Sequence, residues 1–469
     1  MSKSNVKANK SSFRELIIDK QKNYIIPKFQ RTYCWKEANI ESLLQDVCSS
    51  GERKFLGALI LQETSRNVGS EYSSYEVIDG QQRISTLFWI VSVLSNKCIE
   101  ICKHHIDILD ESTEQDLIKK VEGKAAKAAL INKNLFSQEI DSYKTKLHCN
   151  LIDLKEFNES IAHYCVPVFN EYRYGTINNR ADGPEENRGG LKSAIKIIDQ
   201  KIEDKFDKRG LGIYPVDEDE ENNELELEEK KEKFEEIIDS YLGWLDQLSD
   251  NLDFVEIILD EDHDSNEVFT KLNTLGESLN AQDIIRNEIF SLFENEPAEE
   301  THFYKNHWLE FERSLYEDIP NLDNKEDAQR DKAIREHCQK FWHPYALTID
   351  PNTRADDSVI LKVLKRDWEP TMKESALSQT EKALKILEQV KKYVPIYNCI
   401  VLGSVPQFYQ GSGKKKKKLR EEIEKLHRYK PTSGVYFYLF NLLLYGIENK
   451  LKDDQLNSIT QCLIKIESY

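Results

Sequence analysis

The stretch from Tyr75 to Leu94 restricts the fold of this chain more than any other part of the sequence. It predicts a short strand that ends at the turn dipeptide Asp79-Gly80, followed by an apolar run that is long enough for a buried helix. A tight turn between a strand and a helix points the free N–H groups and the positive dipole end of the helix at whatever lies above the strand. The stretch therefore predicts a site for an anion such as a phosphate.

Two charged side chains next to this turn suit a phosphate site. Arg83 lies in the first helical turn, where its guanidinium can donate two hydrogen bonds to one phosphate, and Asp79 can hold Mg²⁺ or orient a water molecule. A second interpretation explains the same residues without a ligand: Asp79 caps the helix, and residues 81 to 83 form a solvated first turn. The residues alone leave both interpretations open.

Length and composition indicate a soluble protein of more than one domain. The chain has 469 residues, which predicts two or three domains, and 39% of them are hydrophobic beside 32% charged. The longest apolar runs, Ile84 to Leu94 and Val435 to Tyr445, are shorter than the roughly 20 residues of a membrane span, so we predict core helices and no membrane association. No secretory signal opens the sequence, and nine cysteines without a disulfide framework suit a reducing compartment. We therefore expect a cytoplasmic protein.

A group of cysteines and histidines is the strongest candidate for a metal site. Cys98 and Cys102 lie four residues apart, and His104 and His105 follow, so that several of these side chains share one face of a helix. The group lacks a Cys-x-x-Cys knuckle and ends an apolar helix, which favours buried structural cysteines. We predict no metal-ligating residues.

Elements before and after the turn predict a small mixed sheet with packed helices. Residues 36–48 carry a helical apolar stripe, residues 55–61 form an apolar strand, and residues 252–259 begin with the alternation of a half-buried strand. Between them, residues 171–190 read as an exposed loop and residues 217–236 are strongly acidic, which predicts a loop and acidic insertion over about 171–236. From Pro297 onward the pattern is helix after helix.

A lysine run interrupts the C-terminal helical pattern. Gly411-Ser412-Gly413 precedes Lys414 to Lys418, but the spacing differs from that of a phosphate-binding loop and no strand comes before it, so we predict a basic surface loop. The net charge of −18 argues against a uniformly basic surface. The run is therefore either a solvated loop or a local contact for a phosphate backbone.

Three motifs together resemble a known family. One is Asp79-Gly80-Gln81-Gln82-Arg83 after a strand. Another, called the first motif below, is Pro27-x-aromatic-Gln30-Arg31-x-Tyr33-x-Trp35. The third, called the second block, contains Phe269, Asn273, Gly276 and Asp283-x-x-Arg286-Asn287. In these motifs the chain resembles the GmrS-like family, the N-terminal component of the GmrSD modification-dependent restriction endonucleases. The spacing from Gly80 to Arg83 is also similar to a box in ParB and sulfiredoxin nucleotide sites. Gln81 and Gln82 stand where sulfiredoxin has its cysteine, so redox chemistry is not implied.

The resemblance implies an α+β fold and a nucleotide site. The expected architecture is a ParB/sulfiredoxin-like domain over residues 1–295, with a small mixed sheet and packed helices, followed by a mainly α-helical domain over residues 296–469. The implied ligand is a nucleoside triphosphate with Mg²⁺. The residues implied to bind it are Gln30, Arg31, Gly80, Gln81, Arg83 and Thr86; those implied in catalysis are Asp79, Gln82 and Arg83; and the second block, folded back on the first motif, implies contributions from Asn273, Asp283, Arg286 and Asn287.

The implied function is that of a nucleotide-binding and nucleotide-hydrolysing module in a defence system against modified phage DNA. The His-Asn-His nuclease signature of full GmrSD proteins is absent from this sequence, so cutting is assigned to a separate nuclease subunit or to an unrecognised C-terminal active site. Two alternatives stay open. A non-catalytic sensor would use the nucleotide only to close the domain and dock a partner, whereas a direct nuclease would need a metal-binding cluster that the sequence does not show.

Overall fold

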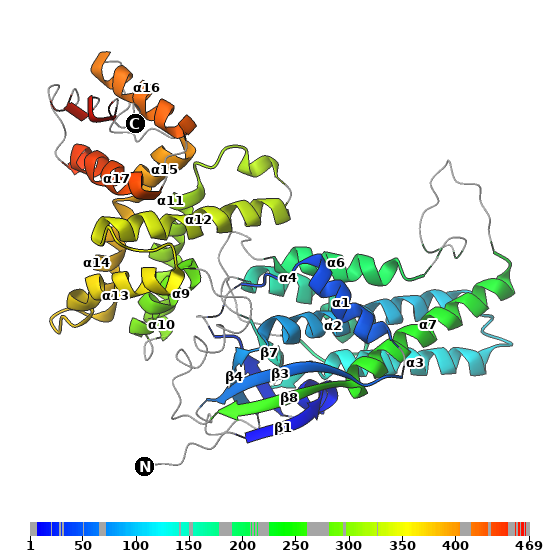
Figure 1. Cartoon of the computed structure of the whole chain (residues 1–469). Helices are drawn as coiled ribbons and strands as arrows, with labels where there is room; N and C mark the ends of the chain where they lie inside the picture. Colours follow the sequence, from blue (N-terminus) through cyan, green and yellow to red (C-terminus); the bar gives the residue numbers. More distant parts are fainter. Residues whose placement is uncertain are drawn as a thin grey trace, which may run out of the picture. The chain divides into compact units, whose positions relative to one another are not determined.

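The computed structural model (Figure 1) divides the chain into two compact units, residues 1–277 and 278–469. This boundary lies before the predicted one, which is between residues 295 and 296. The part of the second block from Asp283 to Asn287 therefore belongs to the second unit. The structure describes residues 7–19, 21–27, 30, 32–49, 51–64, 72–139, 142–149, 153–177, 190–206, 208, 211, 213, 225–259, 281–293, 297–325, 327–403, 414–429, 433–448 and a few positions after 454.

The first unit contains the predicted mixed sheet. Its strands lie in the order β1 (Lys7–Ser12), β8 (Leu252–Leu259), β3 (Lys54–Glu63), β4 (Ser73–Asp79), β2 (Lys22–Ile25) and β7 (Leu147–His148). The pairs β1–β8 and β3–β4 are antiparallel, whereas β8–β3, β4–β2 and β2–β7 are parallel. A separate hairpin joins β5 (Phe136–Gln138) to β6 (Tyr143–Thr145). Strand β4, which leads into the predicted phosphate site, is therefore held from both sides.

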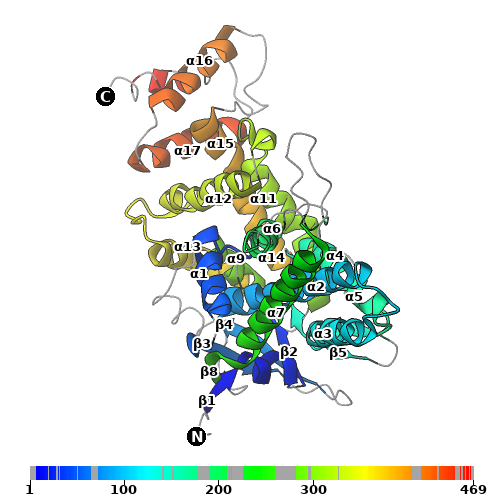
Figure 2. The same cartoon turned by 90° about the vertical axis from the view of Figure 1, so that its right-hand side faces the viewer.

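Helices pack against this sheet and against one another. They are α1 (Glu37–Cys48), α2 (Gln81–Asp107), α3 (Gln115–Lys133), α4 (Leu154–Tyr164), α5 (Val166–Glu171), α6 (Leu191–Glu203) and α7 (Leu227–Asp250), with a π-helical turn at Arg14–Asp19. Figures 1 and 2 show α1, α2 and α7 on one side of the sheet. Together with the helical second unit, this arrangement confirms the predicted fold class.

Helix α2 is the central element of the first unit. Its apolar residues from Ile84 to Leu94 are buried, and it packs against α3, α6 and α7. By length and composition α2 could cross a membrane, but 89% of its most apolar 18-residue window is buried inside the unit. A helix buried on nearly all sides is hydrophobic all round, which explains why the apolar run shows no polar stripe. The burial also fixes the position of its first turn.

The predicted insertion at residues 171–236 is not one continuous loop. Helix α6 lies within it and buries Ile195, Ile198 and Ile202, which recur at the three- and four-residue spacing of a core-facing stripe. The acidic segment also becomes helical earlier than expected, because α7 begins at Leu227 with a capping box formed by Glu226 and Glu229. Residues 178–189 and 214–224 lie outside the described residues.

The regular elements in the described part of the second unit are all helices, as predicted. Its elements are α9 (Ala281–Phe290), η2 (Ser291–Phe293), α10 (Pro297–Phe303), η3 (Tyr304–Trp308), α11 (Leu309–Tyr316), η4 (Leu322–Asn324), α12 (Asp327–Ile349), α13 (Asp357–Met372), α14 (Gln379–Lys391), α15 (Val394–Leu402), α16 (Lys414–Tyr429) and α17 (Ser433–Glu448). Buried tryptophans, including Trp308, Trp342 and Trp368, fill its core.

The prediction of a basic loop at Lys414 to Lys418 was wrong. These lysines form the first turns of α16, and the helix is anchored by Leu419 and Ile423, which lie four residues apart and are buried. Lysine is a good helix former, so the buried pair is sufficient to extend the helix back through the run. Gly411 to Gly413 lie outside the described residues.

Candidate functional site

Gly80, not Asp79, caps the N-terminus of α2. Gly80 adopts a left-handed conformation with φ 93°, and no side chain caps the helix. A Cβ atom at Gly80 would stand 2.9 Å from Cδ1 of Leu59, so glycine is required both by the backbone angle and by the close approach of β3. The interpretation of Asp79 as a helix cap is therefore wrong. The N–H groups of the first turn keep the uncapped geometry that suits an anion.

Arg83 is held by a bulge in strand β3. Its Nη1 donates to the carbonyl of Leu56, and its Nη2 lies 3.8 Å from Oδ2 of Asp79. The register between β3 and β8 shifts between Phe55 and Ala58, and this bulge frees the Leu56 carbonyl from the ladder. Burial lowers the pKa of Arg83, and the charge of Asp79 opposes that effect. The guanidinium is thus held in place beside β3. The side chain of Arg83 is 24% exposed, and that of Asp79 is 49% exposed.

Gly57 makes room for this arginine, which gives a testable prediction. It has φ +96°, and a Cβ atom there would overlap Nη1 of Arg83. Gly51 has a similar φ of +84° but nothing within 4 Å of its Cβ position. We expect Gly57→Ala to lower the unfolding free energy by about 1–2 kcal/mol more than Gly51→Ala, because both carry backbone strain but only the first displaces Arg83. Urea unfolding of the two variants measures this difference, and equal losses would contradict the role given to Gly57.

The first motif is tied to α2 through buried hydrogen bonds. Nε2 of Gln30 donates to the carbonyls of Val77 and Ile78 at 3.2 and 2.8 Å. Gln82 accepts from the N–H of Cys34 at 3.0 Å and donates to the carbonyl of Thr32 at 3.2 Å. Both glutamine side chains therefore hold the segment from residue 30 to residue 34 against the strand and the helix.

Thr86 lies deeper in the same contact. Its hydroxyl donates to the carbonyl of Gln82 at 2.7 Å and lies 2.7 Å from the hydroxyl of Tyr33. Burial raises the pKa of Tyr33, so this phenol stays protonated and donates to Thr86. Thr86 is 0% exposed. In the structure, Thr86 and Gln82 position the first motif, because their side chains form hydrogen bonds with Tyr33, Thr32 and Cys34.

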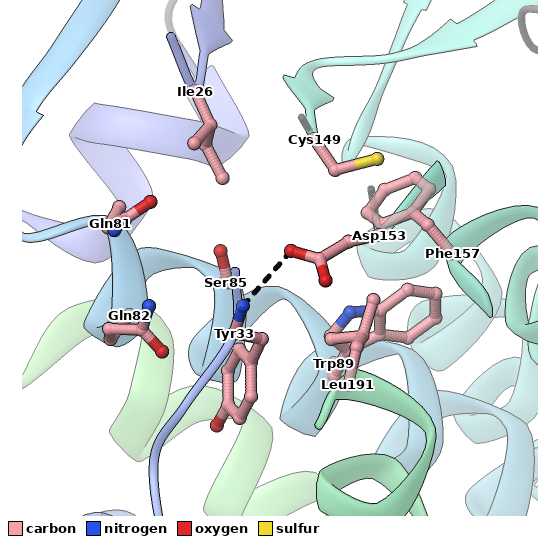
Figure 3. Close-up of a pocket in the computed structure, with 10 residues that line it drawn as sticks. All are labelled: Ile26, Tyr33, Gln81, Gln82, Ser85, Trp89, Cys149, Asp153, Phe157 and Leu191. Carbon is pink, nitrogen blue, oxygen red and sulfur yellow. Dashed lines mark hydrogen bonds between the residues drawn. The ribbon is translucent and has the colours of Figure 1, made fainter. Parts of the chain in front are cut away.

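A cleft opens beside the first turn of α2 (Figure 3). It encloses about 270 Å³ including open solvent, but the room in which a water molecule can sit is only about 10 Å³. Gln81, Ser85 and Trp89 line it from α2, and Asp153 lines it from the N-terminal end of α4. Oδ2 of Asp153 accepts the N–H of Tyr33 at 3.1 Å. Figure 3 shows the carboxylate directed into the cleft from the side opposite Gln81 and Gln82.

The structure separates the predicted site residues into groups. Gln30, Asp79, Gly80, Gln81, Gln82, Arg83 and Thr86 gather around the start of α2. Arg31 and Asn273 lie outside the described residues. Asp283, Arg286 and Asn287 lie in α9 of the second unit, where Arg286 is buried and its Nη2 lies 3.7 Å from Asp283. The return of the second block onto the first motif stays a prediction.

Sequence reasoning missed four residues of this region. Asp153, Ser85 and Trp89 line the cleft, and Gly57 admits the arginine. A glycine inside an apolar strand is a known signal for a bulge or a close approach, so Gly57 could have been found. No local sequence pattern indicates a role for Asp153, because its partner Tyr33 lies 120 residues earlier in the chain.

Cys98, Cys102 and His105 of the cysteine and histidine group are buried, as expected for structural cysteines, whereas His104 is half-buried. Cys98 and Cys102 are both 0% exposed, and their mutual hydrogen bond and burial raise the pKa of Cys98. His105 stacks on Phe234 with ring centroids 5.6 Å apart. Among the residues that the structure describes, no three His, Cys, Asp or Glu side chains form a group able to hold a metal ion.

Comparison with known families identifies the class of this protein. The family model for the GmrSD restriction endonuclease, N-terminal domain, matches residues 13–290, which cover most of the first unit and helix α9 of the second. More particularly, because the match covers more than half of the chain, the chain belongs to the GmrSD restriction endonuclease N-terminal domain family. The resemblance seen in the motifs is thus confirmed. The family acts in defence, and its class implies DNA as the substrate. No curated protein matches the chain.

Proposed function

We propose that the first unit binds a nucleoside triphosphate at the N-terminus of α2 and hydrolyses it, as a module of a defence system directed at modified phage DNA. The observation that carries this proposal is the uncapped first turn of α2 with Arg83 fixed beside it. The helix dipole, the N–H groups of a first turn without a side-chain cap and a guanidinium all favour a phosphate at this point. The close packing of Gly80 on Leu59 keeps the turn in place.

Asp79 is the residue that fits a magnesium ion brought with the nucleotide. It is half exposed at the end of β4, and Mg²⁺ in such sites is typically held by one or two carboxylates, phosphate oxygens and water. Among the described residues, no three His, Cys, Asp or Glu side chains form a group that could hold a metal ion. We therefore propose that the ion arrives bound to the phosphates of the nucleotide. When bound, the ion would neutralise charge on the phosphates.

DNA cutting is assigned to a separate nuclease subunit acting with this protein in the cytoplasm. The family supplies DNA as the substrate of the system. For contact with DNA we propose the lysines at the start of α16, because they concentrate positive charge on a chain with net charge −18. The alternative, a sensor that binds nucleotide without hydrolysing it, uses the same first turn and differs only in turnover.

Substitution of Asp79 separates these two functions. We expect Asp79→Asn to bind nucleotide but to lose most hydrolysis, because the amide removes the charge that holds Mg²⁺ and leaves the Gly80 cap intact. Purified parent and variant are incubated with each of the four ribonucleoside triphosphates, with and without modified DNA, and products are separated by thin-layer chromatography. Binding by the parent without turnover under any condition would favour the sensor, and equal turnover in both proteins would exclude Asp79 from catalysis.

A further inference from the structure

Trp89 carries a buried polar atom that the described chain does not satisfy. The side chain is 0% exposed, and its Nε1–H has no hydrogen-bond partner among the described residues. Buried N–H groups in native proteins are nearly always bonded to protein, to ordered water or to a ligand. Trp89 lines the cleft beside the first turn of α2, where the partner of this N–H can be placed.

The cleft has room for one water molecule between a donor and an acceptor. The room of about 10 Å³ corresponds to roughly one water. The carboxylate of Asp153, a residue that is 6% exposed, faces this space and accepts the N–H of Tyr33 on Oδ2. A carboxylate can accept several hydrogen bonds, so it can receive one more from the water, while the water accepts from Trp89. The hydroxyl of Ser85 lines the same space.

We infer that Trp89 and Asp153 hold the water molecule that attacks the nucleotide, with Asp153 as the general base; this inference rests on the proposed function. The cleft starts at Gln81 and Gln82, which belong to the helical turn proposed to bind the phosphates. Gln82 is committed to Thr32 and Cys34, and Asp79 lies beside Arg83. Asp153 is thus the carboxylate that lines the space where a water next to the terminal phosphate would stand.

The step balances without a further reactant. The water oxygen forms a bond to the terminal phosphorus, and its proton passes to a carboxylate oxygen of Asp153. The bond between that phosphorus and the bridging oxygen breaks, and its electron pair stays on the nucleoside diphosphate. Inorganic phosphate leaves, and Asp153 returns the proton to solvent. General-base catalysis by a positioned carboxylate contributes typically about 10²–10⁴-fold to the rate.

Asp153→Asn tests the general base directly. The amide oxygen can still accept the N–H of Tyr33, so we expect the nucleotide-induced shift in melting temperature to persist while kcat falls about 10²–10⁴-fold. Any residual activity should also lose the acidic limb of the kcat–pH profile, which a purely structural role would not remove. Asp253→Asn is the matched control, since Asp253 is a buried carboxylate of the same unit that pairs instead with Lys10 at 2.7 Å. Unchanged turnover in Asp153→Asn, or loss of binding together with turnover, would overturn the inference.

The water bridge has a test of its own. The chain has six tryptophans, and in ¹⁵N-labelled protein the indole resonance that disappears in Trp89→Phe belongs to Trp89. We expect this resonance to shift in Asp153→Asn and to stay in place in Asp253→Asn. No shift in Asp153→Asn contradicts the bridge. A parent protein that binds no nucleotide refutes the proposed function itself, whereas normal turnover in Asp153→Asn refutes only the role of Asp153.

Discussion

Arg83→Ala is expected to weaken nucleotide binding by the first unit strongly. The guanidinium is the cation that the structure fixes beside the uncapped first turn of α2, and its charge-assisted hydrogen bonds to a phosphate are worth roughly 1.5–3 kcal/mol. Such a loss raises Kd by about 10- to 150-fold. The measurement is the shift in melting temperature caused by each ribonucleotide, because the absolute melting temperature also falls when the Leu56 carbonyl loses its partner.

The control for this experiment removes a different arginine of the same unit. Arg14 donates from Nε to Asp250 at 2.5 Å, so Arg14→Ala also removes an arginine and its ion pair. Its nucleotide-induced shift should equal that of the parent. Arg83→Lys adds a second comparison, since lysine keeps the charge without the two-pronged donor geometry. If Arg83→Ala is stabilised by nucleotide as much as the parent, the phosphate site lies elsewhere.

Neutralising the lysines of α16 is expected to weaken DNA binding strongly and to change its salt dependence. Lys414, Lys417 and Lys418 are exposed, and within the described residues they form no ion pair. The first turn of α16 contains no acidic residue, although cations at a helix N-terminus are unfavourable. If all three contact phosphates, the triple change to Gln should reduce the slope of log K against log salt by about 2.7. Fluorescence anisotropy with a labelled duplex measures K at several salt concentrations.

A matched set of lysines separates local contact from net charge. Lys332, Lys340 and Lys373 are exposed in the same unit. Lys332 and Lys340 lie close to Glu336 of their own helix, α12, and Lys373, the C-cap of α13, lies close to Glu369. Changing these three to Gln alters the net charge equally, so it should leave the slope nearly unchanged. Equal losses in both triple variants would show that DNA responds only to total charge and would remove α16 from the interface.

The sequence by itself determined the local elements and the family. The strand that ends at Asp79, the turn at Gly80 and the apolar helix that follows are set by short-range patterns, because alternation, turn residues and apolar runs act within a few positions. The motif from Asp79 to Arg83 likewise indicated the family that the comparison confirms. The lysine run was misread because its helix depends on Leu419 and Ile423, which lie beyond the run itself.

Only the tertiary structure decided what each side chain at this turn touches. Arg83 reaches back to a bulge in β3, 27 residues earlier, and Tyr33 meets Asp153 across 120 residues. Contacts of this range arise when the sheet and helices pack, and no local pattern encodes which carboxylate will face the cleft. The family resemblance in the sequence therefore implied catalysis by Asp79, Gln82 and Arg83. In the packed unit, Gln82 forms hydrogen bonds with Thr32 and Cys34, and Asp79 lies beside Arg83. Asp153 faces the cleft because α4 begins there.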